Sequence, residues 1–174
     1  MVQHYRFFNE VLKWHADGEE LAVFPNVEQV VPEVAEDYER DHRSLDVLFD
    51  RLNDAISETD PLVTARVTSA FKFFLEKHVD KEDEHLYKIV GARFELPVQG
   101  QIVGRMAGMV PPERMPELIG WMFPLMGHDD RENMTRIWQT VMPPEAFGGA
   151  AHLIQETLGA DWAELTRRIP SLAG

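Results

Sequence analysis

Apolar side chains recur at helical spacing through the first half of the chain. The clearest face, in the segment after Pro32, repeats every three or four positions and carries Tyr38, His42, Leu45, Phe49, Leu52 and Ile56. This spacing predicts one amphipathic helix that ends near residue 57. The same period predicts helices over residues 5–30 and 61–90. No segment alternates apolar and polar residues as a half-buried strand does, so the pattern predicts an all-α protein.

The second half of the chain has a weaker pattern. Residues 91–112 contain four glycines and three prolines, which predict a linker with one short helix. A further helix is predicted over residues 113–142, interrupted at Pro124 and Gly127, and two short helices are predicted over residues 145–174. A chain of 174 residues is expected to form a single domain over residues 1–174.

Each of the three apolar faces carries polar residues at its centre. They are His15 and Glu19 on the first, His42 on the second, and His78 and Glu82 on the third. Burying an unpaired imidazole or carboxylate costs several kcal/mol. These side chains therefore need partners, which are either each other or a metal ion.

The spacing within two histidine–glutamate pairs favours a metal ion as the partner. His15 and Glu19 are four residues apart, as are His78 and Glu82, so each pair lies on one helix face. An imidazole with a carboxylate suits iron, manganese or zinc. Similar residues follow both histidines, which indicates a faint internal repeat. The competing interpretation is a core histidine hydrogen-bonded to an acid, or, for Glu19, a solvated acidic face.

Composition narrows the function classes. The chain has no cysteine, which excludes disulfides, thiolate metal sites and iron–sulfur clusters. Its 30 acidic and 17 basic residues give a net charge of −13, which disfavours nucleic acid and anionic membranes as partners. The sequence shows no signal peptide, membrane span, nucleophile elbow or phosphate-binding loop. A cytoplasmic protein is expected.

Taken together, these residues resemble the hemerythrin-like, His-His-Glu cation-binding family. Residues 15–25 are similar to the first His-x-x-x-Glu helix of that family, and residues 41–52 to its single-histidine helix. Residues 78–87 are similar to its second His-x-x-x-Glu helix. The resemblance implies an antiparallel four-helix bundle, of which residues 1–92 supply the matched helices. Residues 93–174 are then a C-terminal helical extension that completes the bundle, covers the metal or forms a dimer surface.

One element of the family pattern has no counterpart. A first helix with a single histidine is expected before His15, where only fourteen residues are present. That helix is therefore missing, permuted or supplied by a partner chain. The permuted alternative assigns its role to residues 113–142 and makes His128 a further ligand. In the competing interpretation, His128 lies just outside the end of a helix, because Asp129 and Glu132 form a capping-box pattern.

The resemblance implies a non-haem di-iron protein that binds dioxygen or a related molecule such as peroxide or nitric oxide. His15, His42 and His78 are the implied terminal ligands, and Glu19 and Glu82 the bridges between two irons that an oxygen species also links. Another divalent metal is compatible with the same ligands. A binding or sensing protein is expected rather than an enzyme; as an enzyme, it is expected to be a di-iron oxidase or peroxidase. The candidates for an apolar wall are Phe8, Phe49, Phe71 and Phe74, and Tyr38 is the nearest candidate for a proton donor.

Two alternatives stay open. A ferritin-like di-iron carboxylate oxidase uses Glu-x-x-His pairs, which Glu39 with His42 and Glu82 with His85 supply. That reading leaves out His15 and His78. The second alternative is a metal-free helical interaction module whose histidines only pack against acids. The sequence leaves the oligomeric state of the protein open, with a homodimer among the alternatives.

Overall fold

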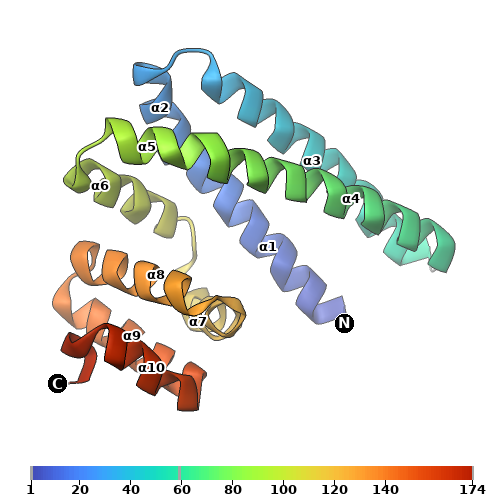
Figure 1. Cartoon of the computed structure of the whole chain (residues 1–174). Coiled ribbons are helices and arrows are strands. Elements are labelled where there is room, and N and C mark those ends of the chain that lie inside the picture. Colours follow the sequence, from blue (N-terminus) through green and yellow to red (C-terminus); the bar gives the residue numbers. More distant parts are fainter. Residues whose placement is uncertain (1, 59, 174) are drawn as a thin grey trace. The chain divides into compact units, whose positions relative to one another are not determined.

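The computed structural model describes residues 2–58 and 60–173, with side chains from residue 5 onward, and these residues form helices throughout (Figure 1). No strand occurs in the part of the chain described, so the all-α prediction is confirmed. The long helices agree with a hemerythrin-like helical bundle. Among these residues, no helix is both long enough and apolar enough to cross a membrane.

The helices separate into two compact units. One, here called the hairpin unit, comprises Glu19–Glu95. The other, here called the C-terminal unit, comprises α1 (Val2–Gly18) and every helix that follows Leu96. The expectation of a single domain over 1–174 stays a prediction.

The hairpin unit is built around two long antiparallel helices that pack along each other, α3 (Val34–Glu58) and α4 (Pro61–Lys81) (Figure 1). Asp60 caps α4, because its carboxylate accepts hydrogen bonds from the backbone amides of Leu62 and Val63. The remaining elements are η1 (Glu19–Val23), α2 (Phe24–Val30), η2 (Glu82–Leu86) and α5 (Tyr87–Arg93).

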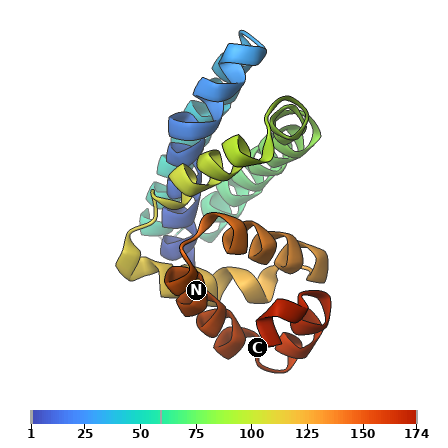
Figure 2. The ribbon, with the colours of Figure 1, turned by 90° about the vertical axis from the view of Figure 1, so that its left-hand side faces the viewer.

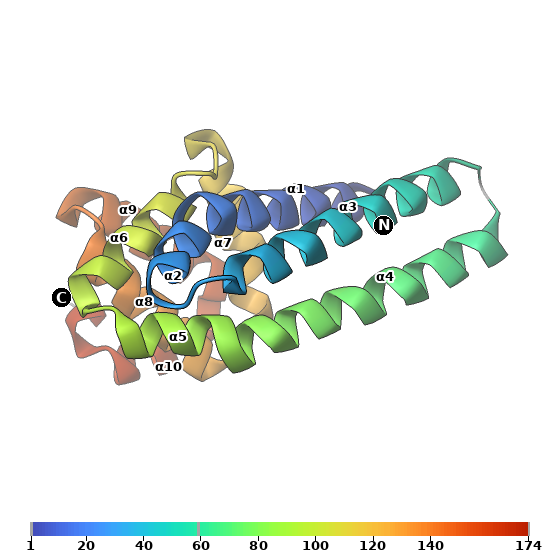
Figure 3. The same cartoon turned by 90° about the horizontal axis from the view of Figure 1, so that it is seen from above.

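The elements η1 and η2 are π-helical turns set into longer helices. In Figure 3, α4, η2 and α5 follow one another as a single rod. The η1 turn ends two residues before Pro25, which occupies the first turn of α2. Proline donates no backbone hydrogen bond, so a helix continues past it only where the local bonding is already irregular. The predicted helix over 5–30 is therefore present with a π turn inside it.

The C-terminal unit has its own apolar core. Its helices are α6 (Leu96–Ala107), α7 (Met115–Met122), α8 (His128–Val141), α9 (Pro144–Leu158) and α10 (Trp162–Arg168), with the last three in orange and red in Figure 2. The core residues are Ile119, Phe123, Trp138, Ala150, Ile154, Leu158, Leu165 and Ile169. Gly100 allows α6 to approach α8 closely, since a Cβ there would lie 2.9 Å from Val141 Cγ1. The predicted linker thus holds a helix of 12 residues.

Candidate metal centre

Four ionisable side chains meet in the interior of the hairpin unit. They are Glu19, His42, His78 and Glu82, and none is more than 6% exposed. One potential ligand atom from each lies within 4.8 Å of the other three. The structure therefore brings together four of the six ligand candidates that the sequence provides.

The two glutamates occupy equivalent places in the fold. Glu19 is the first residue of η1, and Glu82 is the first residue of η2. Residues of the longer helices supply the imidazoles, His42 from α3 and His78 from the last turn of α4. A π turn inserted in an α-helix is often found at a functional site. The faint repeat in the sequence thus corresponds to two π turns, each of which begins at a glutamate.

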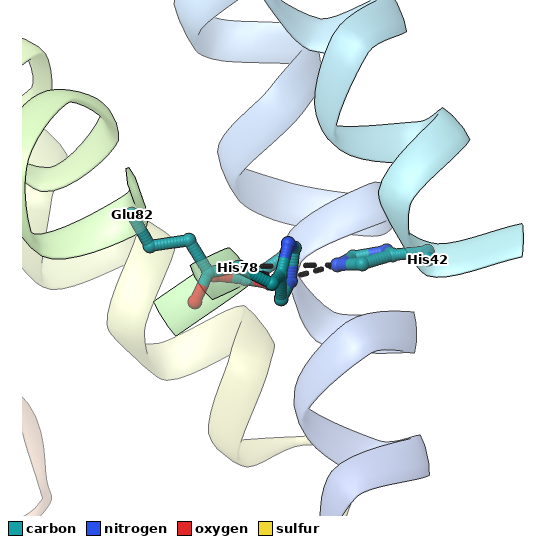
Figure 4. Close-up of side chains that lie close together, drawn as sticks. His42, His78 and Glu82 are labelled. Atoms are coloured by element: carbon teal, nitrogen blue, oxygen red, sulfur yellow. Dashed lines mark ion pairs between the residues drawn. The ribbon is translucent and has the colours of Figure 1, made fainter. Parts of the chain in front are cut away.

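The imidazole nitrogens face the carboxylates at short range. His78 Nε2 lies 2.6 Å from Glu82 Oε1, and His42 Nε2 lies 3.3 Å from Glu19 Oε2 and 3.9 Å from Glu82 Oε1. Figure 4 shows His42, His78 and Glu82 turned toward one another. The two rings lie 4.8 Å apart, centroid to centroid, in an edge-on arrangement. Nε2 of both histidines is therefore the nitrogen that points at the carboxylates.

A second carboxylate lies on the far side of each ring. His42 Nδ1–H donates a hydrogen bond of 2.9 Å to Glu20 Oε1, and His78 Nδ1 lies 3.6 Å from Asp41 Oδ2. Lys81 Nζ fixes Asp41 through a hydrogen bond of 2.7 Å. An outer carboxylate of this kind sets the tautomer and orientation of a metal-binding imidazole. Glu20 is not among the candidates that the sequence provides, because its position beside Glu19 suggests only a solvated face.

A tyrosine contacts one of the glutamates. Tyr87, the first residue of α5, donates a hydrogen bond of 2.5 Å from its hydroxyl to Glu19 Oε1. Burial, followed by the negative charge of Glu19, raises the pKa of Tyr87. Tyr38, the donor considered from the sequence, instead donates to the backbone carbonyl of Lys81 at 3.0 Å.

The charges in this group suit a cation. Burial opposes protonation of His42, yet the carboxylates of Glu19, Glu82 and Glu20 raise its pKa to about 10. Within residues 2–58 and 60–173, the buried atom His42 Nε2, which faces Glu19 and Glu82, has no hydrogen-bond partner. Buried polar atoms normally have one, so this imidazole nitrogen calls for an explanation. Two imidazoles and two carboxylates are a donor set for iron, manganese or zinc, and the residues fit such an ion.

The remaining candidates from the sequence differ in burial. His15 is half-buried on α1, and His128 is exposed at the first position of α8, both in the C-terminal unit. Their ligand roles stay predictions. Glu39 is nearly half exposed and pairs with Arg43 at 3.6 Å, while His85 is exposed. This placement does not favour the ferritin-like arrangement.

The aromatic side chains differ in part from the predicted apolar wall. Phe71 is buried and packs against Phe49 with ring centroids 4.4 Å apart, but Phe74 is 50% exposed. Phe8 packs against Trp121 within the C-terminal unit. Phe24, which was not among the predicted residues, contacts the group with its ring centroid 5.3 Å from that of His42.

Comparison with known proteins gives a family. The model of the Hemerythrin HHE cation binding domain matches residues 1–90, which is just over half of the chain. Zinc finger protein BRUTUS of Arabidopsis thaliana is 25% identical over 149 residues, or 82% of this chain. The match covers 12% of that protein, so the chain corresponds to a small part of its length. No solved structure matches significantly. The chain belongs to the hemerythrin HHE cation binding domain family.

Proposed function

We propose that this protein binds non-haem iron at Glu19, His42, His78 and Glu82, and that the iron site takes up dioxygen or a related small molecule such as peroxide or nitric oxide. The observation that supports this proposal most directly is the buried group itself, whose four ligand atoms lie within 4.8 Å of one another. Family membership supports a cation as the occupant.

The donor set supports iron on chemical grounds. Two carboxylates balance the charge of a divalent cation, which offsets the cost of burying two negative charges together. Two neutral imidazoles with carboxylates leave coordination positions open, and non-haem iron with such ligands takes up dioxygen there. When bound, the iron supplies the electrons and the open positions for this chemistry.

The remaining residues of the site orient the ligands and exclude water. Glu20 and Asp41 face the outer nitrogens of the two imidazoles, so both rings present Nε2 to the interior. Apart from the glutamates, the buried positions of the π turns are apolar; they are Ala22, Val23 and Leu86, all at 0% exposure. A dry apolar surrounding controls solvent access to a metal site.

The family resemblance implies two irons. Four ligand residues are sufficient for one ion, and a second ion needs further donors. His15 is the candidate that the sequence offers, because it precedes Glu19 by four residues. We therefore propose one ion at the buried group, with a second dependent on His15.

The experiment is an iron and oxygen titration. Protein from iron-supplemented cells is reduced without air, its iron content is measured, and the optical spectrum is recorded before and after exposure to air. The proposal predicts at least one iron per chain and an absorption change on exposure that reverses when oxygen is removed. Iron without any spectral response to dioxygen, peroxide or nitric oxide would contradict the small-molecule part. The absence of any stoichiometric metal would leave a metal-free interaction module.

A further inference from the structure

The two π turns share a pattern but differ in one hydroxyl group. In each, an aromatic residue follows the glutamate by five positions: Phe24 follows Glu19, and Tyr87 follows Glu82. Each aromatic residue is the first of the α-helix after the turn. Tyr87 uses its hydroxyl to contact the glutamate of the opposite turn, whereas Phe24 has no hydroxyl to donate.

As a result, the two oxygens of Glu19 have different neighbours. Oε1 accepts the hydrogen bond of 2.5 Å from Tyr87, and Oε2 lies 3.3 Å from His42 Nε2. Glu82 presents Oε1 to both imidazoles, at 2.6 Å from His78 Nε2 and 3.9 Å from His42 Nε2. Glu19 thus receives a hydrogen bond from the aromatic residue that follows the other π turn.

We infer that Tyr87 is a positioning residue that holds Glu19 in a one-oxygen mode, with Oε2 directed at the cation and Oε1 retained by the tyrosine hydroxyl. This inference rests on the proposed cation site. The corresponding residue of the other turn, Phe24, has no hydroxyl with which to hold Glu82 in the same way. A carboxylate that is hydrogen-bonded through one oxygen keeps a fixed orientation, as outer partners of metal ligands generally provide.

The test compares two tyrosine variants with cobalt(II) as the probe. Y87F removes the hydroxyl that contacts Glu19. Y38F is the matched control, because its hydroxyl donates to the backbone carbonyl of Lys81 and not to a ligand. Cobalt(II) replaces iron in such sites, and its visible absorption weakens when the metal gains ligand atoms. Affinity is measured by competition with a chelator, on the full chain.

Y87F is expected to bind cobalt(II) with a weaker visible band, because Glu19 becomes able to use both oxygens, and with about tenfold lower affinity. Y38F is expected to match the unmodified protein in both respects. If Y87F and the unmodified protein have superimposable spectra and affinities, the inference is wrong while the cation site stands. If the unmodified protein binds no cobalt(II) or zinc(II), the cation site and the inference both fail.

A second measurement does not depend on the folding of Y87F. The chain contains three tyrosines, so protein labelled with ¹³C at the phenol carbon gives three signals, which Y5F and Y38F assign. Zinc(II) should shift the Tyr87 signal more than the Tyr38 signal, and the shift should reach its maximum when the site is filled. A Tyr87 signal that does not respond to bound zinc would overturn the inference.

Discussion

Replacement of Glu20 by glutamine tests how the site orients its imidazoles. The Glu20 carboxylate accepts a hydrogen bond of 2.9 Å from His42 Nδ1–H, which directs Nε2 at Glu19, where a bound cation would replace the proton on Nε2. Glutamine keeps the shape of the side chain but removes the charge. Loss of an outer carboxylate typically lowers metal affinity by about 10- to 100-fold. Because the Glu20 side chain is 48% exposed, solvent weakens its contribution, and the lower end of that range applies.

We therefore expect Glu20→Gln to weaken zinc(II) binding about tenfold, equivalent to about 1.4 kcal/mol. Calorimetry or chelator competition at pH 7 measures the change. Asp83→Asn is the matched control, because Asp83 follows Glu82 as Glu20 follows Glu19 and is exposed. It is expected to change affinity less than twofold. Equal effects of the two substitutions would refute the orienting role of Glu20 and leave only a general loss of negative charge.

Two further predictions concern stability. The pKa of His42 rises from 6.5 to about 10 in the folded, metal-free protein, so its stabilising contribution is full below about pH 6.5 and is lost as the pH rises toward 10. Urea unfolding of the chelator-treated protein should show a steeper loss of stability over that interval than His42→Gln does, and identical slopes would contradict the assignment. In the C-terminal unit, buried Arg131 donates to the carbonyls of Phe123 and Pro124 and pairs with Asp161. Arg131→Met should cost about 3 kcal/mol by leaving these acceptors unpaired, without changing metal affinity; a cost below about 0.5 kcal/mol by urea unfolding would contradict it.

Helical periodicity was sufficient to predict the long helices and the four residues that meet in the hairpin unit. His42 and His78 lie on apolar faces, so their burial follows from the same period that buries Leu52 and Phe71. Glu19 and Glu82 follow from their spacing to a preceding histidine. In each case, a polar residue stands at a position that the helical period predicts to be buried, and this indicates a functional side chain.

The π turns explain what periodicity missed. On a straight α-helix, residues five positions apart point in different directions. The helical period therefore does not predict that Phe24 or Tyr87 lies at the same site as the glutamate that precedes it. Each π turn shifts the register of the residues after it, and both aromatic rings reach the site through that shift. The sequence carries no simple signal for such a turn, although the proline after η1 is a hint.

Apolar spacing alone is also not sufficient at two further positions. His128 continues an apolar spacing through Trp121 and Leu125, but Pro124 and Gly127 break the helix between them, and α8 begins at His128 itself. His128 and Trp121 therefore belong to different helices, and their spacing in the sequence does not place them on one face. Phe74 also follows the period of α4 yet is half exposed, because the buried face of that helix is narrower than the apolar pattern.

The most direct test of the account is the metal content of three proteins purified identically from iron-supplemented cells: the unmodified chain, His78→Ala and His85→Ala. His78 is buried 2.6 Å from Glu82, whereas His85 is exposed three residues after it. With the metal site at Glu19, His42, His78 and Glu82, we expect at least one metal ion per chain in the unmodified protein and in His85→Ala. We expect less than a tenth of that in His78→Ala. Loss of metal in His85→Ala with retention in His78→Ala, or equal metal content in all three proteins, would contradict the site described here.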